Sequence, residues 1–243
     1  MERGKRALTR HHVRRDLGVA AIAAVMLLAW DASSLDLALT RWFAGAHGFP
    51  WRHAWLTQSL LHEGGRWAAG ILLASLLVHA LRPAARRPGR GERVRALLST
   101  TACMLAVPAL KRTSATSCPW DLAEFGGVAQ YVSHWSLGAL DGGAGHCFPS
   151  GHAVAAFGFL SVYFMLRDHR PAAAKAWLGA VLLAGLLFAG AQLARGAHYL
   201  SHALWSAWAC WVICSVAAGV PLFKAARCCE PSPPRAPAAA RAD

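Results

Sequence analysis

The sequence predicts an all-α protein, a polytopic bundle of six transmembrane helices with the N- and C-termini in the cytoplasm. Three observations lead to this fold class. The chain of 243 residues is 56% hydrophobic and only 15% charged, whereas an ordinary soluble domain is roughly 25% charged. Six apolar runs follow one another along the chain. The formal net charge is +13, and most of the basic residues lie in the segments between alternate runs. Basic residues are enriched in this way on the cytoplasmic side of membrane proteins.

Six apolar runs supply the predicted spans, at 17–30, 67–81, 96–110, 153–166, 176–194 and 203–223. A spanning helix needs about 20 residues, so the first four runs need flanking small residues or Trp to complete a span. The first run is expected to continue as a helix to about Leu39, past Asp31 and Asp36. The alternative is a soluble bundle, whose helices carry a polar face every 3.6 residues. The fifth and sixth runs show no such face.

The basic residues predict the orientation. Of the 25 Lys and Arg, 19 lie in segments 1–16, 82–95, 167–175 and 224–243. These segments share one side of the membrane if successive spans cross it in alternating directions. We therefore expect a basic cytoplasmic N-terminus over 1–16, a six-span membrane domain over 17–223, and a disordered cytoplasmic tail over 224–243. The membrane bilayer accounts for the charge, and no nucleic-acid partner is expected.

The first run has a second interpretation. A basic N-terminus followed by 14 apolar residues also describes a signal peptide, with Ala32, Ser33 and Ser34 as a cleavage site. Cleavage would leave five spans.

Two of the seven cysteines, Cys118 and Cys147, fall in the same predicted outer segment. An outer membrane face is oxidising. The pair is therefore a possible disulfide.

Polar residues collect at the outer ends of the third, fourth and fifth predicted spans. The chain reads LKRTSATSCPWDLAEFGG from Leu110, GHCFPSGHAVAAFG from Gly145 and AQLARGAHYLSHALW from Ala191. Under the predicted topology all three segments reach one membrane face. Polar residues at membrane depth are costly and tend to be functional.

The segment from Pro149 to His152 leads directly into a span. Ser150 and Gly151 at a helix start present free backbone N–H groups, which suit an anion, and His152 can supply a proton near neutral pH. An interfacial His at an ordinary helix start is the alternative. Lys111 is a candidate phosphate-binding residue. The alternative, for Lys111 and for Arg112, is a basic side chain that only extends its charge to the membrane interface.

His198 and His202 lie four residues apart and share one face of a helix. Three roles are open for them: a nucleophile with its orienting partner, two ligands of a metal or haem, or polar residues at an interface. The string HYLSH lacks the Glu of the zinc motif H-E-x-x-H, so zinc proteolysis has little support.

Together the three segments resemble the type 2 phosphatidic acid phosphatase superfamily, which also contains vanadium haloperoxidases and bacterial acid phosphatases. Its signature has three blocks: K-x6-R-P, then P-S-G-H, then S-R-x5-H-x3-D. Lys111 to Pro119 gives K-x6-C-P, residues 149–152 give P-S-G-H intact, and His198 matches the third-block His. The resemblance covers roughly residues 60–222, and CPWDL with CFPSGH resembles a bacterial membrane-bound lipid phosphatase subgroup.

Three positions depart from the signature. Cys118 stands where the first block has Arg, Gln192 where the third block has Arg, and His202 where it has Asp. Arg195 follows three residues after Gln192, nearly on the same helical face. It is therefore expected to supply the missing guanidinium from one turn away.

The resemblance implies a phosphate site without a metal or other cofactor. Lys111, with Arg195 and Arg112 as further cations, would neutralise the phosphate oxygens. Ser150 and the Gly151 N–H would bind the same oxygens as charge develops.

It also implies a covalent mechanism. His198 would attack phosphorus and become phosphohistidine, while His152 would protonate the leaving alkoxide and later activate water. His202 would accept the other N–H of His198, or a carboxylate such as Asp121 would do so.

The implied substrate is a lipid phosphomonoester or diphosphate, held at the outer face of a bacterial inner membrane with the site towards the periplasm. The alternative is a non-catalytic protein of the same fold that binds or moves a lipid phosphate or anion. A haem or metal membrane protein is a third possibility.

Overall fold

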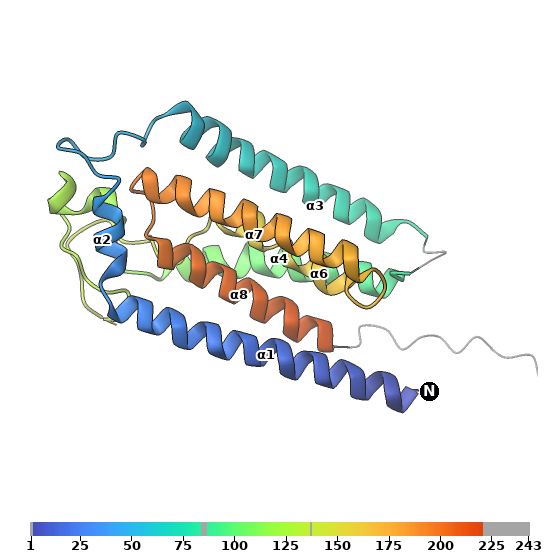
Figure 1. The fold of residues 1–243 in the computed structure, drawn as a ribbon. Coiled ribbons are helices and arrows are strands. Elements are labelled where there is room, and N and C mark those ends of the chain that lie inside the picture. The colour runs from blue at the N-terminus through green and yellow to red at the C-terminus, as the bar shows by residue number, and fades with distance from the viewer. Residues whose placement is uncertain (1, 84–86, 137, 221–243) are drawn as a thin grey trace, which may run out of the picture.

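The computed structural model describes residues 2–83, 87–136 and 138–220, which form a bundle of helices (Figure 1). In chain order its elements are α1 (Glu2–Ala32), α2 (Leu35–Arg41), η1 (Leu56–Gly64), α3 (Gly65–Leu81), α4 (Arg90–Arg112), η2 (Pro119–Asp121), η3 (Ala123–Phe125), α5 (Val154–Phe157), α6 (Leu160–Leu166), α7 (Pro171–Ala194) and α8 (Leu200–Gly219). No strand occurs among these residues, which confirms the predicted all-α class. The predicted tail 224–243 lies outside the described residues.

Four helices are long and apolar enough to cross a membrane: Leu56–Leu81, which joins η1 to α3, and α4, α7 and α8. The bent pair α1 and α2 is a fifth candidate. Large apolar side chains face outward along the bundle, among them Ile22, Ile71, Leu105 and Leu183. Lipid tails are the solvent that such a surface requires. The chain is thus an integral membrane protein.

Two of the predicted spans are built differently. The first helix ends at Ala32, Ser34 adopts the left-handed conformation, and α2 leaves at 64°, so the prediction of a continuous helix to Leu39 is wrong. The fourth run breaks around Gly158 into α5 and α6, and the unit Val154–Leu166 is shorter than a span. The predicted count of six spans is therefore not confirmed.

The short pair α5 and α6 lies in the middle of the bundle, in contact with α4, α7 and α8. Phe157 and Leu160 are each only 2% exposed and pack with Cys103 and Val107 of α4 and Ala203 of α8. Since longer helices surround it, this pair does not have to cover the bilayer thickness. Figure 1 shows the ends of α4, α7 and α1 gathered with α2 and the connecting loops at one end of the bundle, called the site end below.

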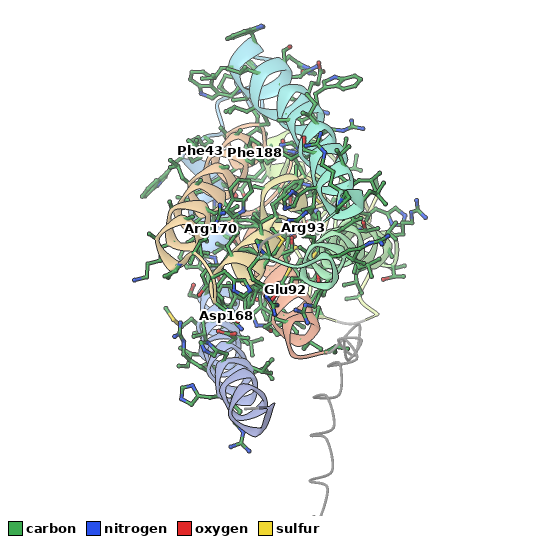
Figure 2. The ribbon with its side chains drawn as sticks, turned by 90° about the vertical axis from the view of Figure 1, so that its right-hand side faces the viewer. Phe43, Glu92, Arg93, Asp168, Arg170 and Phe188 are labelled. Atoms are coloured by element: carbon green, nitrogen blue, oxygen red, sulfur yellow. A yellow bond between two sulfur atoms is a disulfide. The ribbon has the colours of Figure 1, made fainter. Side chains whose placement is uncertain are left out.

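The opposite end carries the α3–α4 connection and the α6–α7 turn. Figure 2 looks at this end and shows Glu92, Arg93, Asp168 and Arg170 gathered there. The Glu92 carboxylate lies 2.8 Å from Nε2 of His169, which ties the start of α4 to the α6–α7 turn. This end is the one that the basic residues predict to be cytoplasmic.

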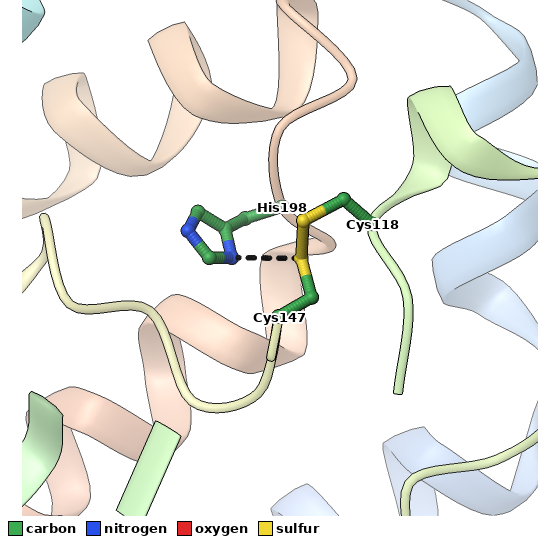
Figure 3. A group of neighbouring side chains, drawn as sticks. All are labelled: Cys118, Cys147 and His198. Atoms are coloured by element: carbon green, nitrogen blue, oxygen red, sulfur yellow. Dashed lines mark hydrogen bonds between the residues drawn. A yellow bond between two sulfur atoms is a disulfide. The ribbon is translucent and has the colours of Figure 1, made fainter. Parts of the chain in front are cut away.

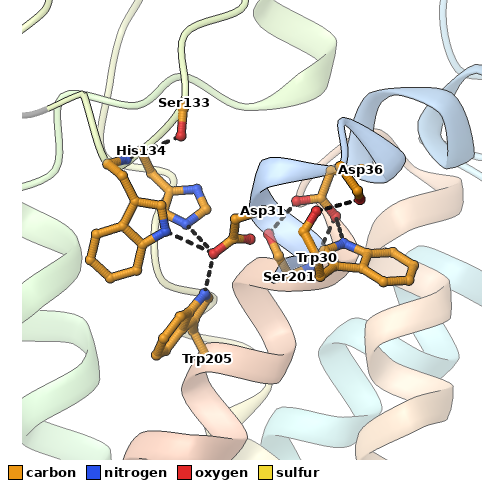
Figure 4. Close-up of polar contacts among 9 residues, drawn as sticks. Trp30, Asp31, Asp36, Ser133, His134, Ser201 and Trp205 are labelled. Atoms are coloured by element: carbon orange, nitrogen blue, oxygen red, sulfur yellow. Dashed lines mark hydrogen bonds and ion pairs between the residues drawn. The ribbon is translucent and has the colours of Figure 1, made fainter. Parts of the chain in front are cut away.

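Two carboxylates dock α1 and α2 against α8 beside the site (Figure 4). Asp31 accepts hydrogen bonds from the indole N–H groups of Trp135 at 2.7 Å and Trp205 at 2.8 Å. Asp36 accepts the backbone N–H of Ser201 at 3.1 Å and also bonds its hydroxyl. Carboxylates at membrane depth are costly unless they are paired or hydrogen-bonded. These bonds therefore explain how α1 and α2 tolerate them.

Gly185 of α7 gives a test of the packing in the middle of the bundle. A Cβ at this position would lie 2.2 Å from ring atoms of Phe157, which is too buried to swing aside. We expect Gly185→Ala to lower the free energy of unfolding by about 1–3 kcal/mol. Gly190→Ala in the same helix is the control, because a Cβ there meets no atom within 4 Å. Equal thermal midpoints of the two variants in detergent would contradict this packing.

Candidate active site

The structure brings the three motif segments together at the site end. Lys111 lies in the last turn of α4, His152 directly before α5, and His198 between α7 and α8. The Lys111 side chain runs past Gly151, where a Cβ would lie 3.8 Å from Lys111 Cδ. The charge of Lys111, and that of His152 when it is protonated, both act on His198. A cation, an imidazole and the turn at Gly151 therefore lie near one buried imidazole.

The turn at Ser150 is held by α8. The Ser150 N–H donates to the His202 carbonyl at 3.0 Å, and the Ser206 hydroxyl lies 2.9 Å from the Ser150 carbonyl. The Ser150 hydroxyl itself is enclosed and has no partner among the described residues. A buried hydroxyl without a partner is costly, so this oxygen is available to a ligand.

His152 also keeps one ring atom unpartnered. Its Nε2 lies 3.2 Å from the Leu61 carbonyl, which can only accept, so Nε2 carries the proton of the neutral ring. Its Nδ1 is buried and bonded by none of the described residues. The rings of His62 and Phe188 pack against it, with centroids 4.4 and 4.9 Å away. Burial, helped by the field of His62, lowers the pKa of His152 to about 4.

His198 lies against a disulfide between Cys118 and Cys147, which confirms the predicted pairing. Its Nδ1 is 3.4 Å from the Cys147 sulfur (Figure 3), and the other ring nitrogen points away from the disulfide. Burial, together with the charge of Lys111, holds the pKa of His198 well below its usual range. The ring is therefore neutral, with Nε2 on the open side.

In the described part of the chain, one group has metal-ligand spacing: the ligand atoms of Cys118, Cys147 and His198 all lie within 4.8 Å of one another. The two sulfurs are bonded to each other. With the disulfide formed, His198 is the single ligand that this group can offer.

His202 and Asp121 have partners other than His198. Nδ1 of the fully buried His202 bonds the Cys147 carbonyl at 3.1 Å, and its ring centroid lies 5.8 Å from that of His198. The Asp121 carboxylate accepts the Cys118 N–H at 3.3 Å, because it lies three residues later in the same tight turn. The structure thus places neither residue as the expected hydrogen-bond acceptor for His198, whose Nδ1 lies against the Cys147 sulfur instead.

The two candidate arginines differ. Arg195 is buried, and its guanidinium donates to the Gln192 side-chain oxygen at 3.0 Å and to the Arg52 carbonyl at 3.0 Å. The expectation that Arg195 shares a face with Gln192 therefore agrees with the structure. Arg112 is exposed and bonds none of the described side chains.

Sequence reasoning missed the contribution of η1. Leu61 supplies the carbonyl for His152, and His62 stacks on the same ring. The signal was present, because His62 precedes the second apolar run on the predicted outer side, where the other motif residues also lie. No spacing rule linked it to them.

A cavity of about 630 Å³ lies beside the turn at Phe148 and Pro149. Its lining comes from α1, α8, the end of α4 and the loop after Val132. It includes the apolar side chains of Leu28, Leu110, Trp135, Trp205 and Trp208. The cavity thus offers an apolar volume within one or two residues of Lys111 and Ser150 along the chain.

Comparison with protein families matches residues 93–224 to the PAP2 superfamily, the phosphatidic acid phosphatase type 2 family that the motifs resemble. The match spans more than half of the chain, which therefore belongs to this superfamily. Its members are generally phosphatases, which supports a hydrolase acting on phosphate esters. No curated protein and no solved structure matches the chain.

The disulfide is expected to stabilise the fold. Replacing Cys118 and Cys147 together by Ser should lower the free energy of unfolding by about 2–4 kcal/mol, because the bond joins residues 29 apart and restricts the unfolded chain. Thermal unfolding in detergent measures the effect. Mass spectrometry of the unreduced protein that found both thiols free would contradict the pairing.

The buried imidazole of His152 predicts a loss of stability in acid. Its pKa falls from 6.5 to about 4 on folding, so between these values the unfolded chain binds more protons than the folded one. Stability should therefore decline as the pH falls from 6.5 towards 4. His152→Gln removes this contribution and should show a shallower decline of the thermal midpoint. Parallel pH profiles for the variant and the wild type would refute the assignment.

Proposed function

We propose that this protein is a lipid phosphatase that hydrolyses a phosphomonoester or diphosphate through a phosphohistidine on His198. The observation that carries the proposal is the setting of His198: a neutral buried imidazole with one nitrogen against the disulfide, the other pointing away from it, and Lys111 close enough for its charge to act on the ring. A nucleophilic His needs this combination of a free lone pair and a nearby cation for the phosphate.

The first step forms a bond from His198 Nε2 to phosphorus and breaks the bond from phosphorus to the lipid oxygen. Lys111, the Ser150 hydroxyl and the Gly151 N–H hold the phosphate oxygens. His152 delivers a proton to the departing alkoxide from its unpartnered Nδ1. That nitrogen must first be protonated, which bound phosphate favours because its negative charge offsets the burial that lowers the pKa of His152 in the empty site.

In the second step water attacks the phosphohistidine. His152 takes a proton from the water, the bond from nitrogen to phosphorus breaks, and His198 is restored. The Cys147 sulfur of the disulfide lies against Nδ1 of the His198 ring, and the fully buried His202 fixes the Cys147 backbone. No step requires a metal ion or another cofactor.

A lipid substrate is supported by the membrane helices and by the apolar cavity beside Phe148 and Pro149. A chain of CH₂ groups in that cavity gains about 0.8 kcal/mol for each group removed from water. The uneven distribution of basic residues favours a site facing the periplasm of a bacterial inner membrane, with the cytoplasm at the opposite end of the bundle.

The alternative is a non-catalytic protein that binds or moves a lipid phosphate or anion. The observation in its favour is that Cys118 and Gln192 stand in place of two phosphate-binding Arg of the family signature. Such a protein would bind phosphate without turnover.

The test is a phosphate-release assay over a panel of lipid phosphates and diphosphates, with purified protein in EDTA. We expect release from at least one lipid, inhibition by orthovanadate, and a loss of at least about 1,000-fold in His198→Ala, because the nucleophile is gone. His47→Ala, an exposed His at the same end, is the control and should keep wild-type activity. Full activity of His198→Ala would end the mechanism, and phosphate binding without release would favour the alternative.

A further inference from the structure

The side chain that replaces the third-block arginine makes a defined hydrogen-bond chain. Gln192 is 4% exposed and lies between two partners. Its Oε1 accepts from the Arg195 guanidinium at 3.0 Å, and its Nε2 is 3.1 Å from Nδ1 of His62. The position that holds a guanidinium in the family signature therefore connects a buried cation to an imidazole from another helix.

This chain of hydrogen bonds fixes the tautomer of His62. A guanidinium can only donate, so the amide oxygen of Gln192 must face Arg195 and its NH₂ group must face His62. His62 Nδ1 is then the acceptor, and the proton of the neutral ring is on Nε2. None of the described residues accepts a hydrogen bond from that Nε2–H, and the side chain is only half-buried. A donor is thus fixed in orientation and left without a partner.

His62 lies within the site. Its ring centroid is 4.4 Å from that of His152, and the charges of Lys111 and Arg195 both act on it. It belongs to the π-helical segment η1, whose Leu61 carbonyl also holds His152. Such π-helical turns occur frequently at functional sites because they redirect side chains and carbonyls.

We propose that His62 is a substrate-binding residue, which donates its Nε2–H to a phosphate oxygen, and that Gln192 and Arg195 position it. The chain from Arg195 through Gln192 to His62 replaces the arginine that the family signature has at position 192. This inference rests on the proposed phosphatase site. It adds a donor from a segment that lies before the family match at residues 93–224.

Binding of inorganic phosphate, measured by isothermal titration in detergent, tests the donor without requiring turnover. We expect His62→Ala to weaken the affinity about 10- to 100-fold, the usual loss for a hydrogen bond to a charged group. His62→Gln, which keeps an N–H donor, should recover part of it. His47→Ala is the matched control and should bind like the wild type. If His62→Ala binds as tightly as His47→Ala, or if wild type binds no phosphate, the proposal is overturned.

A rescue experiment separates binding from folding. Gln192→Arg places a guanidinium where the signature has one, so adding it to His62→Ala should restore at least tenfold in phosphate affinity and in kcat/KM. A structural role of His62 alone would not be rescued, because the added guanidinium does not refill the space of the imidazole. If the double variant is folded, as judged by its thermal midpoint, and its phosphate affinity does not recover, then His62 does not replace the arginine of the signature.

Gln192→Glu tests the positioning. The carboxylate can only accept, so Nδ1 of His62 would need a proton, and Nε2 would donate only when the ring is a cation. Phosphate affinity of this variant should therefore rise more steeply than that of the wild type as the pH falls, because only the protonated ring can donate from Nε2. A pH dependence identical to that of the wild type would contradict the proposed hydrogen bonds from Arg195 through Gln192 to His62. If turnover is lost in His198→Ala but unchanged in His62→Ala, the proposed phosphatase function is supported and only the role of His62 is refuted.

Discussion

The backbone from Cys147 to Ser150 is fixed to the start of α8 by hydrogen bonds with His202, and the geometry of the site depends on this attachment. Nδ1 of His202 bonds the Cys147 carbonyl, and the His202 carbonyl accepts the Ser150 N–H. The same segment carries the disulfide to Cys118. Since His198 rests on Cys147, the attachment sets where the attacking imidazole lies relative to the glycine turn.

This arrangement gives a physical reason for a His at position 202, where the family signature has Asp. A carboxylate bonded to His198 would hold it through a charge, and burying that charge in an apolar bundle is costly. Here His198 lies against the Cys147 sulfur, and the buried His202 bonds the Cys147 carbonyl. The charge of Lys111 acts on His198 and that of Arg195 on His62, so the site carries positive charge that a phosphate can neutralise.

Sequence reasoning succeeded where a feature depends on composition or local order. The all-α class followed from the apolar runs, and the pairing of Cys118 with Cys147 followed from their common side of the membrane. It failed where a helix is shaped by its neighbours. The fourth run is a short broken pair because longer helices enclose it. The first run bends after Ala32, where Asp36 bonds Ser201 of α8, a residue 165 positions away.

By itself the sequence determined the family, the apolar helices and the three segments that carry Lys111, His152 and His198, because motif order and hydrophobic runs are local properties of a chain. Only the tertiary structure decided which groups bond to which. It gave His202 and Asp121 partners other than His198, and it brought His62 to the site through Gln192. The physical reason is that a hydrogen bond depends on distances of about 3 Å between atoms. Such distances are set by how the helices pack and not by spacing along the sequence.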